Sequence, residues 1–187
     1  MKAGVLALQG DFREHSAVLT ELGVTAVLVR TPEELGAVDC LAIPGGESTT
    51  MAKLAHAHGL VEPIRERAEA GMPVFGTCAG LIVMANEVTD GEPLLSLLDV
   101  RVSRNAYGRQ VDSFEATVDV PGIEGGPLQA VFIRAPVVES VGDQVEVLAS
   151  LQGKPVVVEQ GSLLAAAFHP ELGGDGRLHR RMLERVG

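Results

Sequence analysis

The sequence contains no tryptophan, one tyrosine and only 3% aromatic residues in total. A surface that binds single-stranded nucleic acid needs aromatic rings on which bases stack, so this composition argues against such a surface. Basic residues are also few, because 15 lysines and arginines stand against 25 aspartates and glutamates, a formal net charge of −10. Nucleic acid phosphates would repel such a chain, and we expect no nucleic acid partner.

Long hydrophobic runs are missing as well. The longest, such as Ala130–Ile133 and Leu163–Phe168, span a few residues, whereas a membrane-spanning helix needs about 20 apolar residues. The N-terminal segment also has neither the longer apolar stretch nor the small-residue cleavage site of a signal peptide. We therefore expect a cytoplasmic protein that does not contact a membrane.

Cysteine occurs only at Cys40 and Cys78. The two could form one disulfide, but a reducing cytoplasm favours free thiols. A cysteine in the right local context is then a candidate nucleophile, whereas Cys40, which precedes a buried strand, is expected to serve packing. With 187 residues, 46% of them hydrophobic, the chain needs neither a disulfide nor a metal to stabilise its core.

The first half of the sequence alternates short apolar runs with helix signals. Apolar runs at residues 5–8, 25–29, 41–43 and 74–75 predict strands. A helix is expected after the first run, opened by a capping box of Asp11 and Glu14 and ending near Leu22. Because strands that alternate with helices pair in parallel, this pattern predicts a parallel sheet covered by helices on both faces.

The second half contains mainly strand signals between Val100 and Phe168, two of them separated by a Gln152-Gly153 turn. We expect these strands to form a mixed or antiparallel extension of the sheet, and residues 176–185 to form a closing helix. Residues 1–187 are therefore predicted to be a single α/β domain with three layers.

The strongest local signal is Gly76-Thr77-Cys78-Ala79-Gly80, which lies between a short strand and an apolar helix. It matches the nucleophile elbow, a tight turn that projects a side chain at the carboxyl edge of the sheet. The glycines permit close backbone approach, and the positive end of the helix dipole favours a thiolate. The alternative is a glycine-bounded turn around a buried structural cysteine.

A second signal, Phe168-His169-Pro170-Glu171, follows the last predicted strand. A cysteine nucleophile needs a base to accept its proton, and that base needs an orienting group. Residues i and i+2 of an extended segment face the same way, so His169 and Glu171 can supply both roles. A lone histidine at a strand end is more often a surface residue, but the order Cys, His, Glu favours a catalytic set.

The third signal is Pro44-Gly45-Gly46-Glu47-Ser48-Thr49-Thr50, again at a strand end. Paired glycines before a helix expose backbone N–H groups that can stabilise an oxyanion. An ordinary strand-to-helix turn with Ser48 as the N-cap is the alternative. The lysine of a phosphate-binding P-loop is missing, so we expect no nucleotide.

Together, these three motifs resemble the class I, triad-type glutamine amidotransferase family, which implies a flavodoxin-like fold. Narrower stretches resemble the glutaminase subunits of pyridoxal 5′-phosphate synthases. They are Gly-Gly-Glu-Ser-Thr-Thr-Met at residues 45–51, Gly-Arg-Gln-Val-Asp-Ser-Phe-Glu at 108–115 and Phe-Ile-Arg-Ala-Pro at 132–136. With shorter matches, the resemblance extends from about residue 4 to about residue 172.

The resemblance implies hydrolysis of L-glutamine to L-glutamate and ammonia, with no cofactor and no metal. Cys78 would attack the side-chain amide, His169 would shuttle protons and Glu171 would orient the imidazolium. The backbone N–H groups of Gly46 and Ala79 would form the oxyanion hole. The residues implied to hold glutamine are Gly46, Glu47, Ser48, Arg104, Ile133 and Arg134, and the sequence leaves open which arginine meets the carboxylate.

The resemblance also implies a partner, because ammonia released into water is protonated and no longer nucleophilic. The relatives dock, in a hetero-oligomer, on a TIM-barrel synthase subunit that builds pyridoxal 5′-phosphate. Arg13 and His15 could contact such a partner or face solvent, and the role of Tyr107 stays open. His179, within the basic cluster 177–181, is expected on a solvated helix face.

Two other functions fit parts of the sequence. A DJ-1/PfpI-like cysteine hydrolase would share the elbow cysteine, but the His-Pro-Glu element and the glutamine-pocket motifs argue against it. A non-catalytic docking subunit would keep the same fold, and the intact set of Cys78, His169 and Glu171 argues against that reading.

Overall fold

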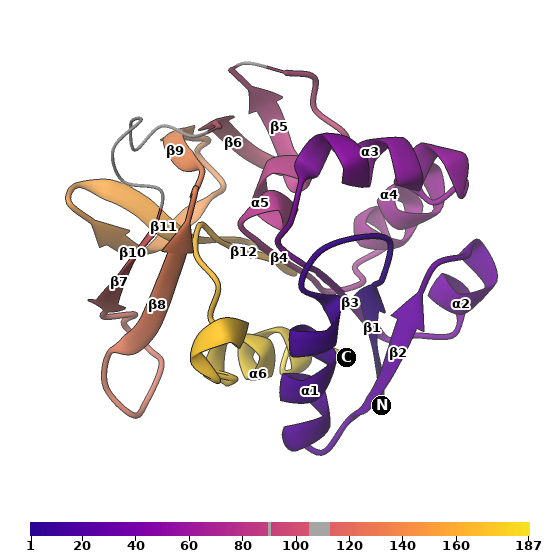
Figure 1. Cartoon of the computed structure of the whole chain (residues 1–187), viewed down its shortest axis with the longest axis horizontal. Helices are drawn as coiled ribbons and strands as arrows, with labels where there is room; N and C mark the ends of the chain where they lie inside the picture. Colours follow the sequence, from indigo (N-terminus) through magenta and orange to yellow (C-terminus); the bar gives the residue numbers. More distant parts are fainter. Residues whose placement is uncertain (90, 105–112) are drawn as a thin grey trace.

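The computed structural model describes residues 1–89, 91–104 and 113–187, so Tyr107 and most of the 108–115 motif lie outside the described residues. Within these ranges, a seven-stranded sheet crosses the molecule in the order β10-β11-β12-β4-β3-β1-β2 (Figure 1). Five neighbouring strands run parallel. They are β1 (Lys2–Leu6), β2 (Thr25–Val29), β3 (Cys40–Ile43), β4 (Val74–Thr77) and β12 (Leu163–Ala166).

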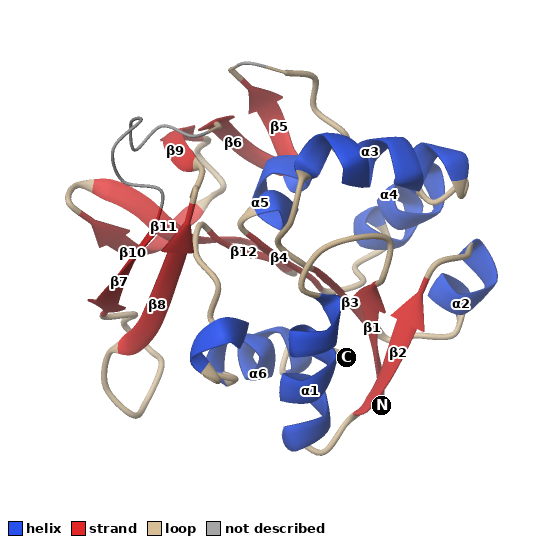
Figure 2. Cartoon of the chain, in the orientation of Figure 1, coloured by secondary structure: helices blue, strands red, loops and turns tan. Residues whose placement is uncertain are grey.

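The parallel strands are short and apolar because both faces of the sheet are covered. Every residue of β3 and β4 is buried. Helices α3 (Ser48–Ala57), α4 (Val61–Glu69) and α5 (Ala79–Met84) lie on one side of the sheet, and α1 (Phe12–Glu21) and α6 (Arg177–Leu183) lie on the other (Figure 2). This confirms the predicted layered α/β class with a mostly parallel central sheet.

Helix α2 (Pro32–Gly36) lies beside the edge strand β2, where local sequence accounts for its start (Figure 1). Thr31 accepts a hydrogen bond from the backbone of Glu34, and Glu34 accepts one from the backbone of Thr31, which is a complete capping box. Pro32 occupies the first turn, where the missing N–H costs nothing.

The predicted antiparallel extension is confirmed in β10 (Glu146–Leu151) and β11 (Lys154–Gln160), which pair antiparallel with each other, as β11 does with β12. The other strands of the second half form two smaller sheets in the described part of the chain. One contains β5 (Ala85–Val88), β6 (Leu98–Ser103) and β9 (Val137–Val141), and the other is the hairpin β7 (Ser113–Val118) and β8 (Leu128–Ile133).

The order of the strands determines where a site can form. Read from the β2 edge, the parallel strands follow the order β2-β1-β3-β4-β12, which is the flavodoxin-like arrangement. In such sheets, ligands bind outside the carboxyl ends of the strands, near the point where the strand order reverses. The loops after β1, β3, β4 and β12 therefore meet at one edge. Among the described residues, no helix is long and apolar enough to cross a membrane.

Candidate active site

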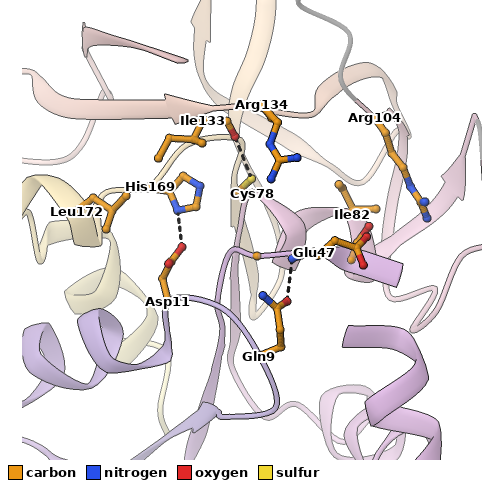
Figure 3. Close-up of a pocket in the computed structure, with 12 residues that line it drawn as sticks. Gln9, Asp11, Glu47, Cys78, Ile82, Arg104, Ile133, Arg134, His169 and Leu172 are labelled. Atoms are coloured by element: carbon orange, nitrogen blue, oxygen red, sulfur yellow. Dashed lines mark hydrogen bonds and ion pairs between the residues drawn. The ribbon is translucent and has the colours of Figure 1, made fainter. Parts of the chain in front are cut away.

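A cavity of about 400 Å³ opens at this carboxyl edge (Figure 3). Its volume falls within the range of small-molecule sites, roughly 300–1,000 Å³. Segments that are far apart in the sequence form its wall, including the loops that follow β1, β3, β4 and β12. The lining residues are Gln9, Asp11, Gly46, Glu47, Ser48, Cys78, Ile82, Arg104, Ile133, Arg134, His169 and Leu172.

Cys78 occupies the sharp turn between β4 and α5 that the sequence predicts. Its backbone adopts φ 50° and ψ −103°, a conformation that is strained for a residue with a side chain. The flanking glycines make the turn possible. A Cβ atom on Gly80 would lie 2.2 Å from the carbonyl oxygen of Ile43, and one on Gly76 would lie 2.7 Å from the Gly80 carbonyl carbon.

The two cysteines lie in different environments. The thiol of Cys78 reaches the cavity and donates to the carbonyl oxygen of Ile133, with a sulfur-to-oxygen distance of 3.8 Å (Figure 3). Cys40 lies inside β3 and is fully buried. Burial, and then the nearby Asp39 carboxylate, raise the pKa of the Cys40 thiol to about 12, so this cysteine stays protonated near neutral pH, as its expected packing role allows.

His169 directs its ring into the same cavity (Figure 3). Its backbone N–H donates to the carbonyl of Val131 at 2.8 Å, which fixes the segment after β12 against β8. Its Nδ1 atom lies 2.8 Å from Oε1 of Glu171 and 3.3 Å from Oδ2 of Asp11. Burial alone would lower the pKa of His169, but hydrogen bonding with Asp11, Cys78 and Glu171 outweighs it and raises the pKa well above its usual value.

Glu171 lies behind His169 rather than in the cavity wall, and its side chain is fully buried. Burial tends to raise the pKa of this carboxyl, but the charge and hydrogen bonds of His15 and His169 lower it far below its usual value. The predicted route to the pair was wrong. Pro170 is helical, with φ −66° and ψ −30°, and Glu171 begins the short helix η1 (Glu171–Gly173), so a turn brings it to His169 instead of an extended segment.

The Gly45-Gly46 segment is tightly enclosed. The Gly45 carbonyl accepts a hydrogen bond from the backbone of Asp11 at 3.2 Å, and the Gln9 side chain accepts one from the backbone of Glu47 at 2.8 Å. A Cβ atom on Gly45 would lie 2.2 Å from Cε1 of His169. Gly46 lines the cavity, and its backbone has φ 146°, which favours glycine.

Two helices begin at this edge. The N-cap of α3 is Glu47, not Ser48, because the Glu47 carboxylate accepts hydrogen bonds from the backbone of Thr49 and from the hydroxyl and backbone of Thr50. These bonds, the Thr50 hydroxyl first, lower the pKa of Glu47 to about 2, so this carboxylate in the cavity wall is ionised. Ala79 is the first residue of α5, where backbone N–H groups lack partners within the helix.

The two predicted arginines both line the cavity. Arg104 follows β6 and donates from Nη1 to the hydroxyl of Thr49 at 3.3 Å, while its buried Nε has no hydrogen-bond partner within the described ranges. Arg134 follows β8, is exposed and has φ 42°. Such strained backbone clusters at functional sites. Both arginines therefore line the same cavity as Ile133 and Glu47 (Figure 3).

Sequence reasoning missed four lining residues, Gln9, Asp11, Ile82 and Leu172. Asp11 was assigned only to a capping box. It does hold the N-cap position of α1, but its side chain makes no capping hydrogen bond in the described structure and contacts His169 instead. The available signal is the place of Gln9 and Asp11 directly after an apolar strand, because the loops after the strands at residues 41–43 and 74–75 are both predicted to form the site.

His179 and His15 correct two further expectations. His179 is fully buried rather than on a solvated face, and His15 is fully buried rather than facing solvent or a partner. His179 shares the inner face of α6 with Leu178 and Met182, and the arginines beside it conceal this apolar spacing. Arg13 is exposed, with its guanidinium carbon 5.9 Å from the centre of the Phe12 ring.

Asp11, His169 and Glu171 each bring one possible metal-ligand atom within 4.8 Å of the other two. The Nδ1 atom of His169, which would have to bind the ion, already lies between the two carboxylates. A metal would have to displace the proton on this nitrogen, which the raised pKa of His169 retains. The site chemistry therefore fits an ion pair better than a metal centre, and a metal-free site stays our prediction.

Comparison with known proteins identifies the family. The model of the SNO glutamine amidotransferase family matches residues 5–186, which is almost the entire sequence. The chain belongs to this family. A glutamine amidotransferase crystal structure is 51% identical and covers 99% of this chain and 98% of its own, with a TM-score of 0.94.

Curated relatives of this chain carry the name pyridoxal 5′-phosphate synthase subunit PdxT. The relative from Mycobacteroides abscessus is 58% identical, over 98% of this chain and 96% of its own length. The relative from Frankia alni is 56% identical, over 99% of this chain and 94% of its own length. A putative GMP synthase subunit from Thermoplasma acidophilum, 17% identical with a TM-score of 0.70 over 100% of this chain and 92% of its own, shows the shared fold alone.

Proposed function

We propose that this chain is the glutaminase subunit of a pyridoxal 5′-phosphate synthase and hydrolyses L-glutamine to L-glutamate and ammonia. The observation that best supports this proposal is that Cys78 and His169, which are 91 positions apart in the sequence, face one cavity. The chain is also related over nearly its whole length to PdxT proteins. His169 is the base beside the thiol, and Glu171 and Asp11 contact its other ring nitrogen.

In the first half of the proposed reaction, the Cys78 thiol gives its proton to His169, and the thiolate attacks the carboxamide carbon of glutamine. The tetrahedral intermediate collapses as the C–N bond breaks and the imidazolium donates its proton to the departing nitrogen. Ammonia and a γ-glutamyl thioester result. The raised pKa of His169 supports this step, because the proton stays on the ring until the leaving group takes it.

In the second half, neutral His169 removes a proton from water, and the hydroxide attacks the thioester. Glutamate leaves, and the proton on the imidazolium returns to the Cys78 sulfur. Glu171 holds the ring and stabilises its charge in both halves. The N–H groups of Gly46 and Ala79 would stabilise the two oxyanions, since each belongs to a backbone segment beside the sulfur.

The charges in the cavity wall suit an amino acid substrate. We propose that the ionised Glu47 meets the glutamine ammonium group and that Arg104 and Arg134 serve its α-carboxylate. Ser48 and Gly46 would supply polar contacts, and Ile133 would cover the apolar stem. The Cys78 thiol must then turn from the Ile133 carbonyl toward the substrate carbon.

The proposed partner is a synthase subunit with a TIM-barrel fold, joined to this chain in a hetero-oligomer. Ile133 and Leu172 line the cavity and are 38% and 40% exposed, so apolar surface available to a partner lies beside the site. We further propose that docking orders the Gly45–Ser48 loop and so couples hydrolysis to ammonia use. The two free thiols favour a reducing compartment, the cytoplasm.

The test is to incubate the chain with glutamine, alone and with a synthase subunit, and to measure glutamate, ammonia and pyridoxal 5′-phosphate. Cys78→Ala and His169→Ala should abolish all three products, whereas Cys40→Ala should retain them. Equal turnover with and without the synthase subunit would remove the coupling. Glutamate release that survives Cys78→Ala would overturn the mechanism.

Two results would favour the alternatives. A DJ-1/PfpI-like hydrolase would show no glutamine cleavage while another substrate is processed through Cys78. A non-catalytic docking subunit would bind the synthase without labelling by a glutamine-mimicking electrophile. The family match argues against both, and neither explains why two arginines and an ionised glutamate line the cavity that the thiol enters.

A further inference from the structure

A row of buried polar side chains, His179, His15, Thr77 and Glu171, lies beneath the candidate active site. His15 belongs to α1 and His179 to α6, and these two helices cover the same face of the sheet (Figure 1). Nδ1 of His15 lies 2.8 Å from Nε2 of His179. Nε2 of His15 lies 3.0 Å from the hydroxyl of Thr77 and 3.4 Å from Oε1 of Glu171. The row therefore ends on the carboxylate that holds His169, and the mechanism above leaves His15 and His179 without a role.

The protonation of His179 determines which ring nitrogens of this row carry hydrogen atoms. The burial of His179, and then the nearby His15, lower its pKa to about 3, so this ring is neutral and carries one N–H. Its Nδ1 has no hydrogen-bond partner among the described residues. One proton lies between Nε2 of His179 and Nδ1 of His15, which are in hydrogen-bond contact. The other His15 nitrogen lies beside the ionised Glu171 carboxylate, which can only accept, so it carries its N–H toward Thr77 and Glu171.

Glu171 needs such a donor. Its side chain is fully buried, and Oε2 has no hydrogen-bond partner in the described part of the chain. Oε1 is held by His169 on one side, at 2.8 Å, and by His15 on the other. A buried carboxylate stays ionised only where hydrogen bonds and charge replace its hydration, so removing one of two donors has a large effect.

We propose that His15, fixed by His179, is a positioning residue of the glutaminase, which holds Glu171 ionised and aligned on His169. The inference rests on the proposed function for its activity readout, because Glu171 matters to turnover only if His169 is the base. His15 itself touches neither the cavity nor the reacting sulfur, so its effect passes through Glu171.

The other described titratable groups near this row contact His169, His15 or His179, and not Glu171. From α1, Asp11 reaches His169, while His15 reaches Glu171. From α6, His179 reaches His15, and the charge of Asp175 acts on His179. Cys78 acts on His169 from the far side. Among the described residues, His15 is therefore the one side chain other than His169 with an ion-pair contact to Glu171.

Two substitutions of similar size separate positioning from packing. Glutamine at position 15 places its amide N–H₂ where Nε2 lies and can still donate to Glu171, whereas asparagine places its amide near Nδ1 and leaves Glu171 without that donor. His15→Gln, His15→Asn and, at the far end of the row, His179→Asn are compared with wild type in the presence of the synthase subunit. The exposed His56 gives the matched control, His56→Gln.

We expect His15→Asn to lower kcat about 10- to 100-fold with KM nearly unchanged, the loss of one hydrogen bond to a charged group. The acid limb of its pH–rate profile should move to higher pH, because Glu171 accepts a proton more easily. His15→Gln should recover most of the rate and the wild-type limb. His179→Asn should fall between them, and His56→Gln should match wild type.

A second readout does not depend on turnover. Ring-nitrogen NMR should show His169 losing its proton at lower pH in His15→Asn than in wild type or in His15→Gln. The proposal would be overturned if both His15 variants lost kcat equally and were less stable than wild type, while their pH–rate profiles stayed unchanged. If wild type releases no glutamate, the proposed function fails, but a shift confined to His15→Asn in the NMR titration would still support the positioning of Glu171.

Discussion

Asp11 and His169 lie 158 positions apart in the sequence, yet Oδ2 of Asp11 is 3.3 Å from Nδ1 of His169. The imidazole therefore has two carboxylate neighbours on one nitrogen, since Glu171 also contacts Nδ1. Glu171 is completely buried, whereas the Asp11 side chain is 35% exposed at the cavity wall. The two acids thus hold the same ring from environments of very different polarity.

Removing the outer carboxylate should weaken the protonated form of His169. We predict that Asp11→Asn moves the alkaline limb of the glutaminase pH–rate profile about half to one pH unit lower, with a threefold to tenfold lower rate above that limb. Glu14→Gln, on the exposed side of the same helix, is the control. Superimposable profiles for wild type and Asp11→Asn would contradict a role of this contact.

Space beside the imidazole is the basis of a second prediction. A Cβ atom on Gly45 would lie 2.2 Å from Cε1 and 2.8 Å from Nδ1 of His169, so Gly45→Ala should push the ring away from the sulfur. We expect turnover to fall about 100-fold or more, because misplacing a catalytic group by about 1 Å has effects of that size. Gly36→Ala has free space at its Cβ position and should retain activity. An active, folded Gly45→Ala protein would show that this contact does not position the ring.

His179 should give the fold a specific dependence on acidity. Its pKa is near 3 in the folded chain and about 6.5 when unfolded, so between these values the unfolded chain binds one proton more than the folded chain. The unfolding free energy should therefore decrease by about 1.4 kcal/mol for each pH unit below about 6.5. His179→Gln cannot titrate and should lose this part of the dependence.

Urea denaturation of wild type and His179→Gln at about pH 7 and about pH 5 measures how much unfolding free energy each protein loses on acidification. Between these two conditions, wild type should lose roughly 2 kcal/mol more than His179→Gln, with unchanged denaturant slopes. His169 contributes equally to both proteins and in the opposite sense, because its raised folded pKa gives stability that is present below about pH 6.5 and is lost as the pH rises. Equal losses in the two proteins would place His179 in a solvated state.

The hairpin between β10 and β11 offers a stability prediction away from the site. Gln152 and Gly153 both have positive φ, 50° and 76°, as a two-residue type I′ turn requires. Asparagine tolerates the first position better, so Gln152→Asn should raise the unfolding free energy by about 0.5 kcal/mol. Gly153→Ala should lower it by about 1 kcal/mol through strain alone, since its Cβ would meet no atom within 4 Å. Chemical denaturation of both variants decides the matter.

Local patterns were sufficient for the central part of the fold. The runs that became β1, β3 and β4 are short, apolar and separated by helix signals, and the glycines around Cys78 specify one type of turn. The strands β5 and β9 gave weaker signals, because the middle of β5 is Asn86-Glu87 and β9 follows Pro136 directly. The pairing of these strands in separate sheets depends on contacts that no short window contains.

The site was predicted as far as sequence motifs extend. Cys78, His169, Glu47, Arg104 and Arg134 belong to recognisable segments, and the structure brings them to one cavity. Asp11 and the pair of His15 and His179 act through partners that are distant in sequence, so their local patterns pointed to a cap, a surface and a solvated helix. Burial of a histidine beside arginines is decided by which helix face meets the sheet, and only the packed structure reveals it.

The position of β12 has a consequence for the synthesis of the chain. This strand inserts beside β4, inside the sheet, and the segment after it carries His169, Glu171 and His179. A growing polypeptide that lacks this segment therefore has the Cys78 thiol but no imidazole to accept its proton, and it also lacks the Ala166 carbonyl that accepts a hydrogen bond from the Cys78 backbone N–H. We therefore expect glutamine hydrolysis to begin only after β12 and the segment that follows it have packed against β4.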